Sequence, residues 1–353
     1  MKPIFLFSCI ILTLFSTGCK DQEPDSGFIS LIAAGQMPSL ATDQSQQLHL
    51  VFGNGDSIMY AVSKDHGHTF SQPALISRLP DLAASHSRGP QIAASDKGII
   101  VTACNSLGDI FSYAIDNSGK WSAGKRVNDV DTVGKEALMA LDADAENSFA
   151  VWLDLRDKHN KIFGARSVDG GKTWSKNMMI YASPDTTVCE CCKPSVAIKG
   201  NKVYVMFRNW LDGNRDMYLI ESLDGGNSFG EAQKLGIGSW ALNGCPMDGG
   251  GLAINEKSGN PQTVWRREGS IYECEPGTPE KEIGVGRGCT MESIAGKNYY
   301  AWTEDGEVVC VLPDGEKRSL GKGGFPVIKA VASNRLICVW ENDKQIHHAT
   351  VSL

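Results

Sequence analysis

The sequence predicts an all-β fold built from repeated units of short strands. One eight-residue pattern, S-x-D-x-G-x-[TS]-[FW], occurs at residues 63–70, 167–174 and 222–229, and a degenerate copy lies at 116–121. Short β-like runs separated by Gly-rich turns fill the rest of the chain, and long amphipathic helical stretches are absent. A pattern that returns at such distances is the signature of a repeat architecture.

Each position of the octapeptide has a physical role. The glycine supplies a positive φ in a tight turn, and the Ser and Asp side chains can hydrogen-bond the backbone of that turn. The terminal aromatic ring adds apolar area beside the hairpin. The pattern resembles the Asp box, or BNR repeat, of sialidases and other β-propellers. This resemblance implies a β-propeller of four-stranded blades, with the box between the third and fourth strands. It leaves the reaction open.

Seven blades are predicted by counting the innermost strands. Candidates for these strands are residues 37–41, 89–93, 136–140, 193–197, 246–250, 290–294 and 325–329. Their spacing of about 35 to 57 residues suits four-stranded blades. The second strands are expected at 49–52, 99–102, 149–152, 203–207, 262–265, 299–302 and 336–340.

The last unit contains only three predicted strands, so we expect the N-terminal run 28–33 to supply its fourth strand and close the ring. Six blades, the number in known sialidases, is the alternative, and it would require the short units from 289 to 353 to merge. Residues 28–353 are therefore predicted to form one propeller domain.

The N-terminus predicts export and a lipid anchor. Residues 1–18 hold Lys2 and an apolar run that is too short to span a membrane. Small residues before Cys19 resemble the bacterial lipobox, which implies lipidation of Cys19, although Ser16 stands where Leu is usual. An ordinary secretory signal is the alternative. Residues 19–27 are expected to be a tether, which would place the protein in the bacterial cell envelope, at the outer membrane.

Charge and hydropathy exclude several partners. The formal net charge is −7 and no basic run occurs, so we expect no nucleic-acid partner. No later apolar run reaches spanning length, and contact with a membrane is therefore expected only through the lipid anchor.

A binding site is expected where loops entering the innermost strands meet loops between the second and third strands, around the central funnel. Sialidases, which this chain resembles, hold a carboxylate with three arginines. Arg88-Gly-Pro90 is similar to the R-I-P strand start of that family, and Arg208 and Arg266 could complete the set. Asn209 adjoins Arg208 and is a further candidate for substrate binding.

The catalytic groups of a sialidase are not recognisable in this chain. No Tyr falls in a predicted funnel loop, and the segment 104–109, where the acid-bearing loop is expected, is very short. Another carboxylate pair could serve hydrolysis, and the candidates are Glu136, Asp248 and Glu292. Nothing in their spacing selects a pair, so enzymatic activity stays open.

Cysteines are the second informative feature of the predicted funnel rim. Five of them are expected to converge there: Cys189, Cys191, Cys192, Cys245 and Cys289. Sulfur ligands suit Zn²⁺ or Cu⁺. Disulfides are the alternative, because an exported chain meets an oxidising environment. Nine cysteines remain of eleven when Cys9 and Cys19 are set aside, so at least one has no partner within a monomer.

Three functional hypotheses therefore follow from the sequence. The first is a tethered propeller that binds, and if it is an enzyme hydrolyses, a glycan or another small anionic ligand. The second is a non-hydrolytic metal-binding or redox propeller that uses the cysteines. The third is a scaffold whose funnel mediates protein contacts.

Overall fold

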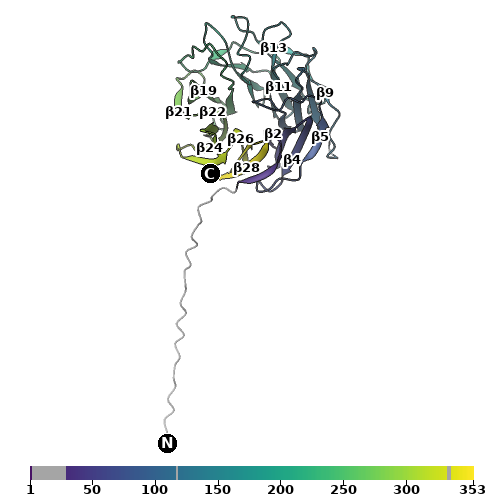
Figure 1. Ribbon diagram of the computed structural model, residues 1–353, viewed down its shortest axis with the longest axis vertical. Helices are drawn as coiled ribbons and strands as arrows, with labels where there is room; N and C mark the ends of the chain where they lie inside the picture. Colours follow the sequence, from purple (N-terminus) through teal and green to yellow (C-terminus); the bar gives the residue numbers. More distant parts are fainter. Residues whose placement is uncertain (2–28, 117, 332–334) are drawn as a thin grey trace.

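Seven four-stranded antiparallel sheets form a ring in the computed structural model, which describes Met1 and residues 29–116, 118–331 and 335–353 (Figure 1). Blade 1 contains β2 (Gln36–Thr42), β3 (Leu48–Asn54), β4 (Ser57–Ser63) and β5 (Ala74–Arg78), and blade 2 contains β6 (Gln91–Ser95), β7 (Gly98–Cys104), β8 (Ile110–Ala114) and β9 (Lys125–Arg126). Blade 3 contains β10 (Met139–Asp144), β11 (Asn147–Asp154), β12 (Lys161–Ser167) and β13 (Met178–Tyr181), and blade 4 contains β14 (Ser195–Lys199), β15 (Lys202–Arg208), β16 (Met217–Ser222) and β17 (Gln233–Lys234). Blade 5 contains β18 (Gly250–Ile254), β19 (Pro261–Arg267), β20 (Ser270–Cys274) and β21 (Lys281–Val285). Blade 6 contains β22 (Arg287–Ile294), β23 (Lys297–Glu304), β24 (Glu307–Val311) and β25 (Lys317–Lys322). Blade 7 contains β26 (Gly324–Val331), β27 (Arg335–Asn342), β28 (Gln345–Ser352) and the N-terminal β1 (Ser30–Ala34).

The ring closes as the sequence predicted. Strand β1 pairs antiparallel with β28, with Ser30 opposite His348 and Ala34 opposite Gln345. The first and last parts of the propeller thereby share one sheet, and blade 7 has no missing strand. The prediction of seven blades is confirmed, and the six-blade alternative is wrong because β22–β25 and β26–β1 form two separate sheets.

The predicted second strands all lie within observed second strands, but several inner strands begin later than predicted. Strands β6, β10, β14 and β18 start two to four residues after the expected positions. In two of these blades a residue with positive φ, Ala137 or Met247, precedes the strand. Such a residue turns the backbone out of the ladder, so the regular strand starts only after it.

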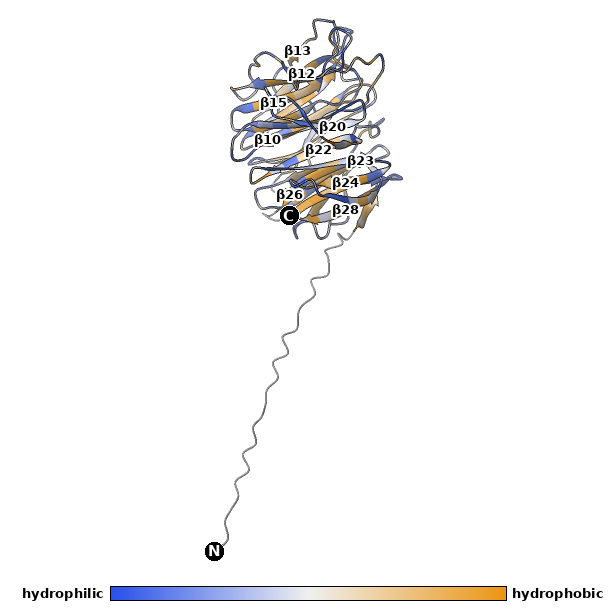
Figure 2. Cartoon of the chain, turned by 90° about the vertical axis from the view of Figure 1, so that its left-hand side faces the viewer, coloured by the Kyte–Doolittle hydropathy of each residue, from blue (hydrophilic) through white to orange (hydrophobic). Residues whose placement is uncertain are grey.

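Seven clusters of buried hydrophobic side chains fill the spaces between neighbouring blades. Second strands provide the largest of these side chains, including Trp152, Trp302, Trp340, Phe52 and Phe207. Figure 2 shows the apolar residues along the strands and the polar residues in the loops. The core is therefore a ring of inter-blade interfaces, and no blade buries its apolar faces alone.

The octapeptides lie between the third and fourth strands of blades 1, 3 and 4, as predicted, and each closes its turn with the same hydrogen bonds. In blade 3, Ser167 Oγ donates to Asp169 Oδ1 at 2.9 Å and accepts from Gly171 N at 2.9 Å. Asp169 also accepts from the backbone N and the hydroxyl of Thr173, at 2.9 and 2.5 Å. In blade 1 burial opposes the shift, but the equivalent hydrogen bonds, from Thr69 and Ser63, lower the pKa of Asp65 to about 2.

The same octapeptides also fasten each blade to the preceding one. A Cβ on Gly171 would lie 2.6 Å from Ile100 Cγ2, on β7 of blade 2, so only glycine permits this approach. Trp174 Nε1 donates to Ser112 Oγ of blade 2 at 2.8 Å. In blade 4 the ring of Phe229 packs edge-on against Phe149 of blade 3, with centroids 5.6 Å apart. The octapeptide is thus an inter-blade contact as well as a hairpin.

The predicted leader, the lipidation site Cys19 and most of the tether lie outside the described residues. In the part of the chain that the structure describes, no helix is long and apolar enough to cross a membrane.

The substitution Gly171→Ala tests the inter-blade contact. It combines a positive φ of 77° with a collision against Ile100, so we expect the free energy of unfolding to fall by about 3 kcal/mol. The matched control is Gly55→Ala, where φ is 55° and no atom lies within 4 Å of the added Cβ. This change should cost about 1 kcal/mol. Urea unfolding of both variants measures the difference, and equal losses would contradict the proposed contact.

Candidate functional site

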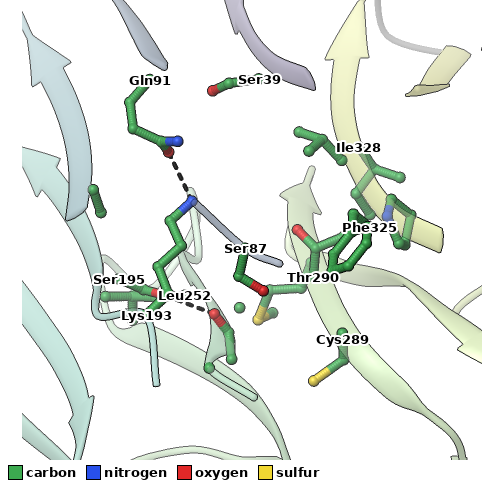
Figure 3. Close-up of a pocket in the computed structure, with 18 of the residues that line it drawn as sticks. Ser39, Ser87, Gln91, Lys193, Ser195, Leu252, Cys289, Thr290, Phe325 and Ile328 are labelled. Atoms are coloured by element: carbon green, nitrogen blue, oxygen red, sulfur yellow. Dashed lines mark hydrogen bonds between the residues drawn. The ribbon is translucent and has the colours of Figure 1, made fainter. Parts of the chain in front are cut away.

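The central funnel opens where the inner strands begin. A cavity of about 230 Å³ lies there, lined by residues of blades 1 to 7 that include Met37, Gln91, Lys193, Asp248 and Cys289 (Figure 3). A second cavity of about 520 Å³ adjoins it over blades 5 to 7. The two share lining residues such as Ser87, Gly288 and Phe325, so they form one continuous depression.

Lys193 lines the central cavity and has no ionic partner among the described residues. Its Nζ donates to Gln91 Oε1 at 2.7 Å. Burial lowers the pKa of this amine to about 8, so it is still largely charged at neutral pH. Hydroxyl groups of Ser39, Ser87 and Thr290 belong to the same lining. The sequence reasoning missed Lys193, although it placed this residue at the start of an inner strand.

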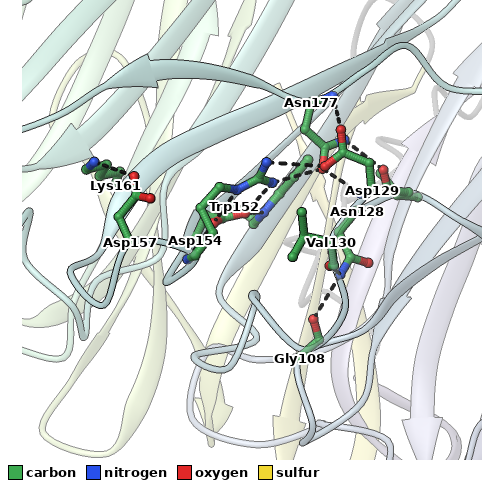
Figure 4. A network of polar contacts seen from close by, with 11 residues as sticks. Gly108, Asn128, Asp129, Val130, Trp152, Asp154, Asp157, Lys161 and Asn177 are labelled. Atoms are coloured by element: carbon green, nitrogen blue, oxygen red, sulfur yellow. Dashed lines mark hydrogen bonds and ion pairs between the residues drawn. The ribbon is translucent and has the colours of Figure 1, made fainter.

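Arg156, at the same end of the propeller, is by contrast fully occupied by protein acceptors. This residue, in the loop after β11, donates to the buried Asp154 at 2.9 Å. Figure 4 shows the polar network around Asp154, Asp129 and Asn177. Arg156 also contacts Asp129 at 3.2 Å and Asn177 Oδ1 at 3.1 Å. Its guanidinium stacks 4.1 Å from the ring centroid of Phe163. This network joins loops of blades 2 and 3 and leaves little donor capacity for a ligand.

The three predicted substrate-binding arginines donate to protein acceptors. Arg208 is 2% exposed and donates to the backbone carbonyls of Arg215 at 2.7 Å and Arg266 at 2.8 Å. Arg266 bonds Asp248 at 2.6 Å. Arg88 Nε donates to the Glu136 carbonyl at 2.7 Å, and its side chain lies 3.6 Å from the Glu136 carboxylate. The structure brings Arg208 and Arg266 together and ties Arg88 to blade 3.

Asn209 is fully buried in the loop after β15. Its Nδ2 donates to the Tyr181 hydroxyl at 2.8 Å, and its backbone N donates to the Asp216 carbonyl at 2.9 Å. These contacts hold the base of the loop that carries Arg215.

The three candidate carboxylates lie in separate surroundings. Asp248 is 4% exposed, and burial raises its pKa against the opposing charges of Arg266 and Arg208. Burial also raises the pKa of Glu136 beside Arg88. Glu292 bonds Lys329 at 3.0 Å and lines a cavity of about 650 Å³ at the opposite end of the inner strands. Asp248 and Glu292 therefore line different cavities, and each of the three has a basic partner.

The glycines 249–251 allow close packing of neighbouring strands. A Cβ on Gly249 would lie 2.5 Å from the Lys193 carbonyl oxygen, and one on Gly251 would lie 2.7 Å from Met291 N. They draw blades 4, 5 and 6 together around the funnel, which explains this Gly-rich segment without a ligand.

Four of the five predicted rim cysteines meet at one point. Cys191 and Cys245 form a disulfide that joins the loops before the inner strands of blades 4 and 5. Cys189 Sγ lies 3.5 Å from Cys192 Sγ and 3.7 Å from Cys191 Sγ, and Cys191 and Cys192 are 4.0 Å apart. Cys289 is a free, buried thiol that lines the central cavity. The predicted sulfur-rich cluster at the rim is therefore confirmed for Cys189, Cys191, Cys192 and Cys245.

One arginine side chain contacts the cluster directly. Arg215 Nη1 donates to Cys189 Sγ at 2.9 Å, and the Arg215 guanidinium stacks 4.2 Å from the ring centroid of Trp210. The contact with Cys192 and the charges of Arg215 and Arg208 lower the pKa of Cys189 to about 6 despite its burial. Cys192 shows the opposite shift, because burial raises its pKa. The sequence had not linked Arg215 to the sulfurs.

No protein-family model and no curated protein matches this sequence. Solved structures do match. The BP39L lectin of Burkholderia pseudomallei has a TM-score of 0.65 at 10% identity, covering 92% of this chain and 97% of that chain. An α-L-arabinanase of Penicillium chrysogenum, complexed with arabinobiose, has a TM-score of 0.52 at 12% identity, covering 93% and 98%. The NanB sialidase of Streptococcus pneumoniae has a TM-score of 0.50 at 13% identity, covering 96% and 73%. These likenesses support a sialidase-like propeller fold.

The substitution Arg208→Lys separates a structural role from a ligand-binding one. Lysine cannot reach all the carbonyl groups that Arg208 now bonds, so buried acceptors lose their partners. We expect the free energy of unfolding to fall by about 3 kcal/mol. The exposed Arg78→Lys, on β5, should change it by less than about 0.5 kcal/mol. If thermal unfolding showed that Arg208→Lys is as stable as the wild type, Arg208 would not be a structural residue and would again be a candidate for ligand binding.

Proposed function

We propose that this propeller binds an acidic glycan, or another small anion, in its central funnel, with the Lys193 ammonium as the anion-binding group. The observation that carries the proposal is the lone charge of Lys193, which has an amide oxygen as its partner and no carboxylate among the described residues. A half-buried cation without a counter-ion attracts an anion into the cavity.

The lining of the depression supports a polyhydroxylated ligand. Ser39, Ser87, Gln91 and Thr290 offer donors and acceptors beside Lys193. Phe325 and Met291 add apolar surface to the same lining. The adjoining cavity of about 520 Å³ falls in the size range of ligand pockets, and it would take further residues of a glycan. The carbohydrate class is suggested by propellers of the same fold, among them a lectin and an arabinanase complexed with arabinobiose.

Binding is better supported than hydrolysis. Asp248, the candidate acid in the funnel, accepts from Arg266 at 2.6 Å and from Gly288 N at 3.2 Å. Both carboxylate oxygens of Asp248 therefore already accept from protein donors, and the group is poorly placed to reach a substrate. Glu292, which the sequence suggested as the second carboxylate, accepts a hydrogen bond from Lys329.

The substitution Lys193→Met tests this function. Binding of glucuronate or sialic acid, measured by calorimetry, should weaken by about 10- to 100-fold, since one desolvated charge pair is lost. Lys199→Met, at the far end of β14, the strand that follows Lys193, is the matched control and should bind normally. Affinity of the wild type should also fall as pH rises through about 8, because Lys193 then loses its proton. Equal binding by Lys193→Met and the wild type would overturn the assignment, and equal binding of glucose would remove the anion preference.

We further propose that the chain is exported and held by a lipid on Cys19 at the bacterial outer membrane, with residues 19–27 as the tether. The apolar run before Cys19 supports this localisation. In a bacterial host, Cys19→Ala should move the protein from the membrane fraction to the soluble fraction, whereas Cys9→Ala should not. Membrane retention of Cys19→Ala would contradict the lipid anchor.

A second candidate function is the binding of a soft metal ion, Zn²⁺ or Cu⁺, at the rim cysteines. The observation that favours it is the mutual approach of Cys189, Cys191 and Cys192, whose sulfur atoms lie within 4.8 Å of one another. Metal analysis of the purified, reduced protein tests it, and the absence of any bound ion at saturating Zn²⁺ or Cu⁺ would remove it.

A further inference from the structure

We propose that Cys189, Cys191, Cys192 and Cys245 form a redox-gated four-sulfur metal centre, which takes up Zn²⁺ only when the Cys191–Cys245 disulfide is open. This inference rests on the proposed metal-binding function and adds its ligand set and its control. Two loops supply the ligands, one before the inner strand of blade 4 and one before that of blade 5.

The distances between the sulfurs suit a tetrahedral ion. With a Zn–S bond of about 2.3 Å, the edges of a regular sulfur tetrahedron are about 3.8 Å long. Three sulfur–sulfur distances in the cluster are 3.5, 3.7 and 4.0 Å. Cys189, Cys191 and Cys192 therefore already form one face of such a tetrahedron. The fourth corner falls to Cys245, which the disulfide holds against Cys191.

The surrounding charges suit a dianionic centre. Four thiolates around Zn²⁺ carry a net charge of −2, which is costly to bury without cations. Arg215 donates directly to Cys189 Sγ at 2.9 Å. Arg208 is 2% exposed, and its backbone carbonyl accepts from Cys189 N at 3.1 Å, so this residue is anchored directly beside the cluster. Two fixed guanidinium groups thus match the charge of the zinc tetrathiolate, while Cu⁺ with four thiolates would leave one negative charge unmatched.

The disulfide acts as the gate because it occupies two of the four ligands. A dithiol reductant opens it by thiol–disulfide exchange: the reductant gives up two electrons and two protons and becomes a cyclic disulfide, while Cys191 and Cys245 become thiols. Zn²⁺ then replaces the remaining thiol protons, which pass to solvent. In the closed state only Cys189 and Cys192 remain as free sulfur ligands in the cluster.

Zinc binding to the whole domain in both redox states tests the proposal. One sample is kept oxidised, and the other is treated with a dithiol that is removed anaerobically before Zn²⁺ is added in competition with a chromophoric chelator. We expect one ion per reduced chain and an affinity at least about 100-fold lower in the oxidised chain. Co²⁺ in place of Zn²⁺ should give the intense visible bands of a tetrahedral thiolate site only after reduction.

Three variants make the result specific. Cys245→Ser cannot form the disulfide, and since Cys245 is exposed the fold should tolerate the change. It should bind Zn²⁺ with the same affinity with and without reductant, at a level between those of the two wild-type states. Cys274→Ser is the matched control. It replaces a free cysteine on β20 and should keep the wild-type redox dependence. Arg215→Gln should weaken zinc binding by about 10-fold, because the N–H···S donor and its charge are lost.

Each result has a definite meaning. Equal zinc affinity in the oxidised and reduced wild type would overturn the gate and leave a metal site. No zinc or cobalt binding in either state would overturn the metal-binding function itself. Redox dependence that persists in Cys245→Ser would show that another thiol pair is the gate, and would likewise overturn the proposal.

Discussion

Apolar packing between neighbouring blades is the interaction on which the rest of this structure depends. Seven buried clusters, one at each inter-blade interface, hold the sheets around the ring. The octapeptide glycines allow three hairpins to approach the preceding blade, and β1 joins β28 to close the circle. Because every blade is supported on both sides, the loops at the funnel rest on a rigid base.

Within that ring, the hydrogen-bond partners of each polar side chain show whether it stabilises the fold or is available to a ligand. Arg156 and Arg208 are bonded on all sides by carboxylate, amide or carbonyl oxygens, and they stabilise loops. Lys193 has one neutral partner in the funnel, and the sulfurs of Cys189 and Cys192 have one arginine donor between them. These two places retain capacity to interact with something outside the protein, an anion in the first and a soft cation in the second.

The same two places are close in the chain. Lys193 follows Cys192 directly, and Asp248 of the funnel wall stands three residues after Cys245. Both segments lead into inner strands, β14 and β18, that line the central cavity. The disulfide between these segments therefore fixes two adjacent sectors of the funnel relative to each other.

Local sequence was sufficient for the architecture. The octapeptides, the apolar second strands and the strand-length run at the N-terminus determined the blade order and the closure, because these features depend on short-range turn chemistry and on alternation along a strand. The predicted order of the blades also placed the cysteine-containing loops at one end of the propeller. Tertiary structure alone decided which polar groups are used. The sequence suggested that Arg208 was available to a ligand, yet it donates to the carbonyl groups of Arg215 and Arg266. The sequence did not single out Lys193, whose Nζ has only the neutral Gln91 as a hydrogen-bond partner in the described part of the chain. Ion pairing and burial depend on neighbours from other blades, and a single sequence does not display these long-range contacts.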